Sequence, residues 1–143
     1  MARLPAVERF PLHLIANQPA TRLHGQLDHG PVSQASKIRG REPIRMRPDD
    51  AVARGLEAGD IVRVFNDRGS CLAGVVLDDG LLPNVVQLAT GAWYDPLDPS
   101  DPGSMCVHGN ANVLTPDVAR RRCPTDARGS TCSSTSSGST ASC

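Results

Sequence analysis

A chain of 143 residues is long enough for one domain with a single core and too short for two domains of ordinary size. Its 15 basic and 15 acidic side chains balance, so neither nucleic acid nor an anionic membrane is predicted as a partner. No apolar run approaches the about 20 residues that a membrane-spanning helix needs. With two Phe, one Tyr and one Trp, any core must be aliphatic.

The cysteines and the N-terminal residues bear on the compartment. Five cysteines are an odd number, and none are spaced as the Cys-x-x-Cys pairs of zinc or redox sites. Glu8 and Arg9 interrupt the start before any apolar region develops, so it does not resemble a secretory signal. These features predict reduced thiols in a cytoplasmic protein.

The first expected elements are short. Residues 12–16 are apolar and predict a short buried strand, and a polar, basic-aliphatic run follows to residue 27. Residues 28–41 have no steady apolar period and several turn formers, which predicts an exposed loop. Residues 44–47 alternate apolar and basic side chains, the pattern of a strand.

A short helix is expected next. Pro48 suits a first helical position, and Asp49 and Asp50 favour the positive end of the helix dipole. Gly55 offers a left-handed exit. The two adjacent acids are therefore predicted to be helix-start charges, not a catalytic pair.

A hairpin and a further strand complete the expected sheet. Residues 61–65 form a β-branched run, residues 66–69 predict a turn in which Gly69 supplies a positive φ, and residues 71–77 predict the return strand. Residues 84–88 are another apolar strand, and residues 95–103, rich in Asp, Pro and Gly, are a loop. Several short strands with one brief helix indicate a small β-barrel.

Four segments, in order, resemble one known family. They are residues 17–26 (NQPATRLHGQ), 47–64 (RPDDAVARGLEAGDIVRV), 91–96 (GAWYDP) and 106–115 (CVHGNANVLT). In these segments the chain resembles the C-terminal molybdopterin-dinucleotide-binding domain of the dimethyl sulfoxide reductase family. Biotin sulfoxide reductases resemble it most, then trimethylamine N-oxide and dimethyl sulfoxide reductases. The resemblance covers about residues 9–118.

The resemblance implies a mainly β fold with short helices, a double-psi β-barrel of the aspartate decarboxylase-like type. The expected organisation is an N-terminal lead (1–10), the molybdopterin-dinucleotide-binding barrel (11–118) and a disordered tail (119–143). The tail has a run of three arginines and is otherwise rich in Ser, Thr and Gly, with no apolar face to offset its ordering entropy.

Two departures from the family pattern stand out. Gly25 occupies a position where the family usually has serine, and after Val118 the family's glycine, threonine, serine ending is missing. If residues 118–143 are written in GC-rich codons and one base is inserted after the codon for Val118, the shifted reading frame can encode that ending. We therefore interpret residues 119–143 as an out-of-frame tail and expect a barrel incomplete at its C-terminus, an interpretation that the gene sequence tests.

The resemblance implies that the domain binds molybdopterin guanine dinucleotide, present as Mo-bis-MGD in the intact enzyme. A pterin dinucleotide needs amide and imidazole groups for its ring edges and cations or N–H groups for phosphate. Arg22 is expected at phosphate or a pterin oxygen, and His24 and Gln26 at the pterin edge. The remaining expected contacts are amide side chains, namely Asn17, Gln18, Asn110 and Asn112.

The resemblance also sets the expected partners: the remaining subdomains of a molybdenum oxidoreductase that reduces S-oxides or N-oxides. These would supply the metal ligand, so no catalytic or metal-binding residue is assigned within this chain. Such an enzyme would be periplasmic instead of cytoplasmic if it carried a twin-arginine signal.

Simpler alternatives stay open. Arg22 is also explained as a solvated charge, His24 as a buried structural histidine and Asn112 as a turn cap. Trp93 and Tyr94 are expected to pack and to anchor their loop, and the lesser alternative is that they line a substrate funnel. Cys106 near His108 lacks an orienting acid at a readable spacing. At the level of the whole chain, a free-standing double-psi barrel acting as an interaction module, or a stand-alone enzyme, is the alternative.

Overall fold

The computed structural model describes residues 9–115 and 139–141, and within these ranges the fold is mainly β with short helices, as the sequence predicts. The helical segments are α2 (Pro31–Ser36), α3 (Pro48–Val52) and the 3₁₀ turn η1 (Ala111–Leu114). The strands are β1 (Leu12–Ile15), β2 (Pro43–Met46), β3 (Ile61–Phe65), β4 (Ser70–Leu77), β5 (Val85–Leu88) and β6 (Ser139–Ala141).

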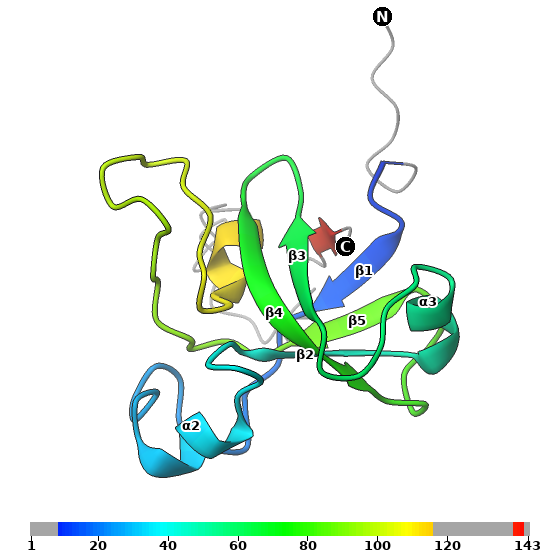
Figure 1. Cartoon of the computed structure of the whole chain (residues 1–143), viewed down its shortest axis with the longest axis horizontal. Helices are drawn as coiled ribbons and strands as arrows, with labels where there is room; N and C mark the ends of the chain where they lie inside the picture. The colour runs from blue at the N-terminus through cyan, green and yellow to red at the C-terminus, as the bar shows by residue number, and fades with distance from the viewer. Residues whose placement is uncertain (1–8, 116–138, 142–143) are drawn as a thin grey trace, which may run out of the picture.

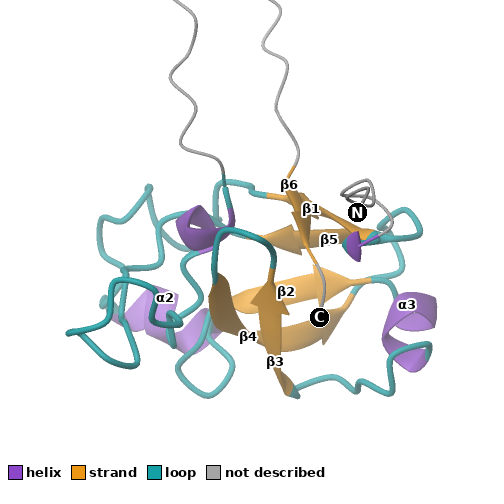
Figure 2. Ribbon diagram, turned by 90° about the horizontal axis from the view of Figure 1, so that it is seen from above, coloured by secondary structure: helices purple, strands orange, loops and turns teal. Residues whose placement is uncertain are grey.

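These strands form one curled sheet in the order β3-β4-β2-β5-β1-β6 (Figure 1). β1 pairs parallel with β5 and β2 parallel with β4, whereas the β2–β5, β3–β4 and β1–β6 pairs are antiparallel. Parallel neighbours cannot be joined by a tight turn, so their connections are long and carry the helices. α2 and α3 consequently lie at opposite ends of the sheet (Figure 2).

The core lies on one face of this sheet. Side chains along β1, β2 and β3 alternate between buried and more exposed positions, so each strand contributes every second residue to the core. The short buried strand predicted over residues 12–16 is present as β1 but is buried on one face only: Leu12 and Leu14 lie in the core, whereas Ile15 is 42% exposed. The largest fully buried apolar side chains are Leu12, Ile44, Met46, Leu88, Leu114, Val64, Val75 and Val86.

The helix at Pro48 is confirmed. Pro48 occupies the first turn together with Asp49 and Asp50, and Gly55 follows the helix at φ +67°. The Asp50 carboxylate also accepts a hydrogen bond of 2.7 Å from the backbone N–H of Asn84. The acids therefore have a structural explanation at the helix start, as predicted.

The β3–β4 hairpin is confirmed, but the expected role of Gly69 was wrong. The positive-φ glycines do not include Gly69, and the turn is closed by Asn66 Oδ1, which accepts from the N–H groups of Arg68 and Gly69. A Cβ at Gly69 would lie 2.9 Å from the carbonyl oxygen of Val113. Glycine is needed here because another backbone approaches closely, a fact that local turn chemistry does not reveal.

The expectation of an exposed loop over residues 28–41 was wrong in part. Part of this segment forms α2, and Asp28, Ser33 and Lys37 are buried. Charged side chains are rarely buried unless they are paired, and here Asp28 and Lys37 pair with each other. A search for apolar periodicity does not find side chains such as Asp28 and Lys37, which are buried as a charge pair.

Residues 139–141 form β6 antiparallel to β1, with Leu12 opposite Ala141. They belong to the segment predicted as a disordered tail; the rest of that segment, and with it the predicted frame change, lies outside the described residues. Across the described ranges, no helix is long and apolar enough to cross a bilayer.

Candidate cofactor pocket

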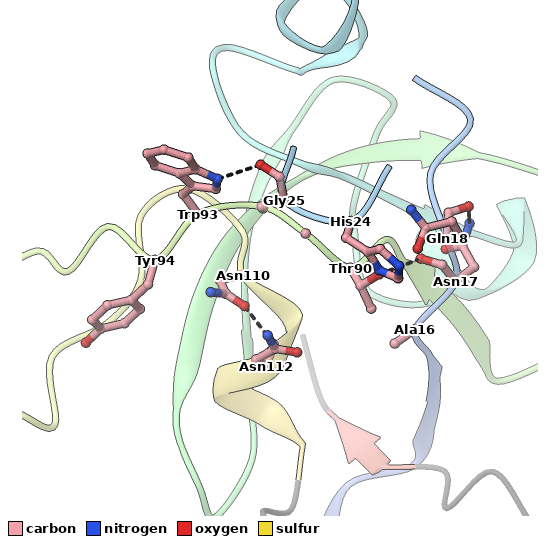
Figure 3. Close-up of a pocket in the computed structure, with 12 residues that line it drawn as sticks. Ala16, Asn17, Gln18, His24, Gly25, Thr90, Trp93, Tyr94, Asn110 and Asn112 are labelled. Carbon is pink, nitrogen blue, oxygen red and sulfur yellow. Dashed lines mark hydrogen bonds between the residues drawn. The ribbon is translucent and has the colours of Figure 1, made fainter. Parts of the chain in front are cut away.

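A hollow of about 760 Å³ opens where four segments distant in sequence meet (Figure 3). It is lined by residues 16–18 at the end of β1, by residues 24–25, by residues 90–94 and by residues 110 and 112 beside η1. We call this hollow the amide pocket. Two of the four segments, 16–18 and 24–25, overlap the stretch 17–26 and a third, at residues 110 and 112, lies in the stretch 106–115; the sequence analysis had singled out these two stretches separately.

Five of the seven predicted contact residues line this pocket: Asn17, Gln18, His24, Asn110 and Asn112. Their amide and imidazole groups both donate and accept hydrogen bonds, which suits a polar heterocycle with alternating donors and acceptors at its edge. No lysine or arginine is among the described residues that line the pocket. A phosphate bound here would therefore be held by N–H groups instead of cationic side chains.

Arg22 and Gln26 do not line the pocket. Gln26 is exposed, and its backbone N–H bonds the carbonyl of Leu23 across a tight turn. The side chain of Arg22 is fully buried, between the carboxylates of Asp28 (3.5 Å from Nε) and Glu42 (3.1 Å from Nη2). Arg22 is thus neither the solvated charge nor a free cation in the pocket.

Two of the segments that line the pocket, residues 24–25 and residues 90–94, are in close backbone contact. Gly91 has φ +88°, and a Cβ on it would lie 2.0 Å from the carbonyl oxygen of His24 and 3.0 Å from the N of Gly25. His24 itself has φ +51°, a left-handed conformation uncommon for residues other than glycine. The backbone bend at His24 and the missing side chain at Gly91 together bring two walls into contact.

Trp93 is anchored beside this contact although 56% of it is exposed. Its indole Nε1 donates to the carbonyl of Gly25 at 2.7 Å, and its ring packs edge-on against His29 with the centroids 4.7 Å apart. A Cβ at Gly25 would lie 3.3 Å from Nε1, so a side chain there would crowd the indole. Glycine at position 25 thus leaves room for the Trp93 indole.

Asn110 has a structural role as well as a place in the pocket. It is buried, precedes η1 and accepts a 2.9 Å hydrogen bond from the backbone N–H of Asn112 through Oδ1. The Nδ2 group of Asn66 donates to Leu114 O at the other end of η1. The cap of this turn is therefore Asn110, not Asn112 as the simpler alternative had it.

A buried group of charges contacts the pocket-lining residues Thr90 and Trp93, and of its members the sequence analysis named only Arg22. We call it the charge cluster: Arg22, Asp28, Lys37 and Glu42. Lys37 Nζ lies 2.8 Å from Asp28 Oδ1 and 2.9 Å from Glu42 Oε2, and two cations balance two carboxylates. Nothing in the apolar pattern marks these residues, because their burial depends on partners 5 to 20 positions away along the chain.

The carboxylate of Asp28 is strongly stabilised in its charged form. Burial raises its pKa, but hydrogen bonds from Lys37, the Trp93 backbone and His108, with the charge of Lys37, outweigh burial and hold the pKa well below its ordinary value of 3.8. The unfolded chain therefore takes up a proton at Asp28 at a higher pH than the folded chain does.

This difference predicts a pH-dependent stability. As the pH falls below 3.8, protonation of Asp28 in the unfolded state lowers the free energy of unfolding, and the stabilisation is fully present at neutral pH. Urea unfolding followed by Trp93 fluorescence, from pH 7 to about pH 3, measures this slope. Asp28→Asn is expected to flatten the slope, and an unchanged slope would contradict the assignment.

Comparison with known proteins agrees with the sequence resemblance. The family described as "Molydopterin dinucleotide binding domain" matches residues 12–128, beyond the boundary predicted at residue 118. The chain is 44% identical over 110 residues to a dimethyl sulfoxide/trimethylamine N-oxide reductase of Cereibacter sphaeroides, covering 77% of this chain and 13% of that protein. It is 46% identical over 115 residues to trimethylamine-N-oxide reductase 1 of Escherichia coli K12, covering 80% and 14%.

A solved structure shares the fold. Acetylene hydratase from Pelobacter acetylenicus matches with a TM-score of 0.59 at 15% identity, covering 75% of this chain and 15% of that one. The chain thus spans about one seventh of the length of the curated relatives it matches (13–14%). On the family match and the identity to these reductases, the chain belongs to the family of molybdopterin-dinucleotide-binding domains.

Proposed function

We propose that the amide pocket contacts the pterin edge of a molybdopterin guanine dinucleotide, through Asn17, Gln18, His24, Asn110 and Asn112. The observation that carries the proposal is the meeting of residues 17–18 and 24–25 with residues 110 and 112 around one polar hollow. Each of these groups can complement an amide-like edge of a pterin or guanine ring.

An incompletely bonded atom in the pocket wall supports the fit. Asn17 Oδ1 is buried and has no hydrogen-bond partner among the described residues. Its Nδ2 group donates to Gln18 O at 3.2 Å, which leaves the amide oxygen as an acceptor. A buried acceptor without a donor is costly, and an N–H group of a bound pterin would satisfy it.

The parent protein is proposed to be a molybdenum oxidoreductase that reduces S-oxides or N-oxides. The named relatives are reductases of this kind, and this chain corresponds to 13–14% of their length. The cofactor, as Mo-bis-MGD, would supply oxygen-atom transfer at its metal, while the residues of this domain bind and orient it. The remaining subdomains would be its partners and would supply the metal ligand.

Three finer features belong to the same proposal. The two parallel strand pairs β1–β5 and β2–β4, joined through β2–β5, support a double-psi arrangement of the half-barrel. The buried thiol of Cys106 supports a cytoplasmic location. A likeness to biotin sulfoxide reductases stays a prediction, since the relatives compared are dimethyl sulfoxide and trimethylamine N-oxide reductases.

The proposal predicts that the full chain binds guanosine 5′-diphosphate. Its guanine ring has an amide edge like that of the pterin, and its pyrophosphate corresponds to that of the cofactor. Trp93, the one tryptophan in the sequence, lines the pocket and reports occupancy through its fluorescence. Asn112→Ala, an exposed change that keeps the η1 backbone bond, should weaken binding by about three- to tenfold, the value of one lost hydrogen bond.

Gln87→Ala is the matched control. Gln87 is a half-buried amide that does not line the amide pocket but lines a neighbouring cavity of about 210 Å³, which shares Asn17 and Gln18 with that pocket. Its substitution should leave the affinity within about twofold. No fluorescence response in the wild-type chain, or a loss of binding in Gln87→Ala but not in Asn112→Ala, would refute the assignment of the pocket.

A further inference from the structure

One buried carboxylate, that of Asp28, joins a segment that lines the amide pocket to a segment that leads into its opposite side. Asp28 Oδ2 accepts a 2.9 Å hydrogen bond from the backbone N–H of Trp93 and lies 2.9 Å from Nε2 of His108. Trp93 lines the pocket with its neighbours in residues 90–94, and His108, which does not itself line the pocket, lies two residues before the lining residue Asn110. Asp28 itself follows the wall at residues 24–25 by three positions.

The second oxygen of Asp28 is fixed by the charge cluster. Lys37 Nζ lies 2.8 Å from Oδ1, and Ser33 Oγ donates to the same oxygen at 3.4 Å. The side chains of Asp28 and Lys37 have no exposed surface, so neither has a hydrated alternative position. The carboxylate is therefore immobilised from below while its other oxygen points toward the pocket walls.

Arg22, which lies beside Asp28, also bonds two residues that line the pocket. Its Nη2 donates to Thr90 O at 2.9 Å, and its backbone carbonyl accepts from Gln18 Nε2 at 3.3 Å. Thr90 and Gln18 both line the pocket, whereas Arg22 does not. Charge-assisted bonds in a buried setting are stronger and more directional than neutral ones at a surface.

We propose that Asp28 is a positioning residue, which holds the Trp93 and His108 segments at the spacing that the cofactor requires. This inference rests on the proposed function and adds to it a residue outside the pocket lining. Loops are mobile unless they are tied down, and ordering them before binding removes an entropic cost from association. Asp28 would raise affinity without touching the ligand.

The test compares two variants that each neutralise one carboxylate of the charge cluster. Asp28→Asn removes the charge that holds the Trp93 N–H and His108, whereas Glu42→Gln removes an equal charge whose partners are Arg22 and Lys37. Both should lower the urea midpoint. Only Asp28→Asn should weaken guanosine diphosphate binding by tenfold or more and shift the Trp93 emission of the unliganded chain.

Equal losses of affinity in the two variants would reduce Asp28 to a general stabilising role and overturn the proposal. So would wild-type affinity in a folded Asp28→Asn chain. If the wild-type chain does not bind guanosine diphosphate, the proposed function fails, but the Trp93 emission of unliganded Asp28→Asn still tests the positioning role.

A measurement on the wild-type chain covers the case in which Asp28→Asn does not fold. The Trp93 and Gly103 amides both donate to an aspartate carboxylate at 2.9 Å, but Asp28 is buried and Asp101 is exposed. Hydrogen exchange at Trp93 should be at least a hundredfold slower than at Gly103. Similar exchange rates would mean that Asp28 does not hold this wall, and the proposal would fail.

Discussion

Gly91→Ala is expected to destabilise the full chain by at least about 3 kcal/mol and to abolish guanosine diphosphate binding. The added Cβ would lie 2.0 Å from the carbonyl oxygen of His24, and this neighbour is backbone, which cannot rotate away. The segments 24–25 and 90–94 must then move apart, which changes the shape of the pocket that they line. Urea unfolding and a fluorescence titration measure the two effects.

Gly59→Ala is the matched control for backbone strain. Gly59 has φ +89°, almost the φ +88° of Gly91, but a Cβ there meets nothing within 4 Å. The variant should lose only about 1–2 kcal/mol, the strain of a left-handed alanine, and bind normally. If Gly91→Ala loses no more stability than Gly59→Ala and binds guanosine diphosphate normally, the segments 24–25 and 90–94 are not in the close contact described above.

Arg22→Ala is expected to lower the free energy of unfolding by about 3–5 kcal/mol. The substitution would leave Asp28 and Glu42 buried with Lys37 as their one remaining cation in the charge cluster. A buried carboxylate that loses its partner is not rescued by water, so the change acts on folding before it acts on any ligand.

Arg45→Ala provides the comparison at the surface. Arg45 pairs with Asp78 at 3.3 Å, but its side chain is 55% exposed, so its loss should cost below about 1 kcal/mol. An Arg22→Ala chain that remains as stable as Arg45→Ala but no longer binds guanosine diphosphate would restore the direct phosphate or pterin contact that the sequence resemblance implied.

Local chemistry explains where the sequence prediction of the fold succeeded. Pro48 with two following acids begins α3, and the β-branched run at residues 61–65 forms β3 with the predicted bounds. Both signals act within a few residues of the element they specify. Likewise, Asn17 and Asn112 could be picked as pocket residues from separate segments, although their proximity could not.

Long-range contacts explain where it failed. Gly69 is required because the carbonyl of Val113 approaches its backbone, and Asp28 and Lys37 are buried because each neutralises the other. The sequence by itself therefore determined the class of fold, the family and most of the polar groups around the hollow. The tertiary structure alone decided that Arg22 and Asp28 are buried together and do not line the pocket, because a charge is buried only where folding brings its counter-charges within bonding distance.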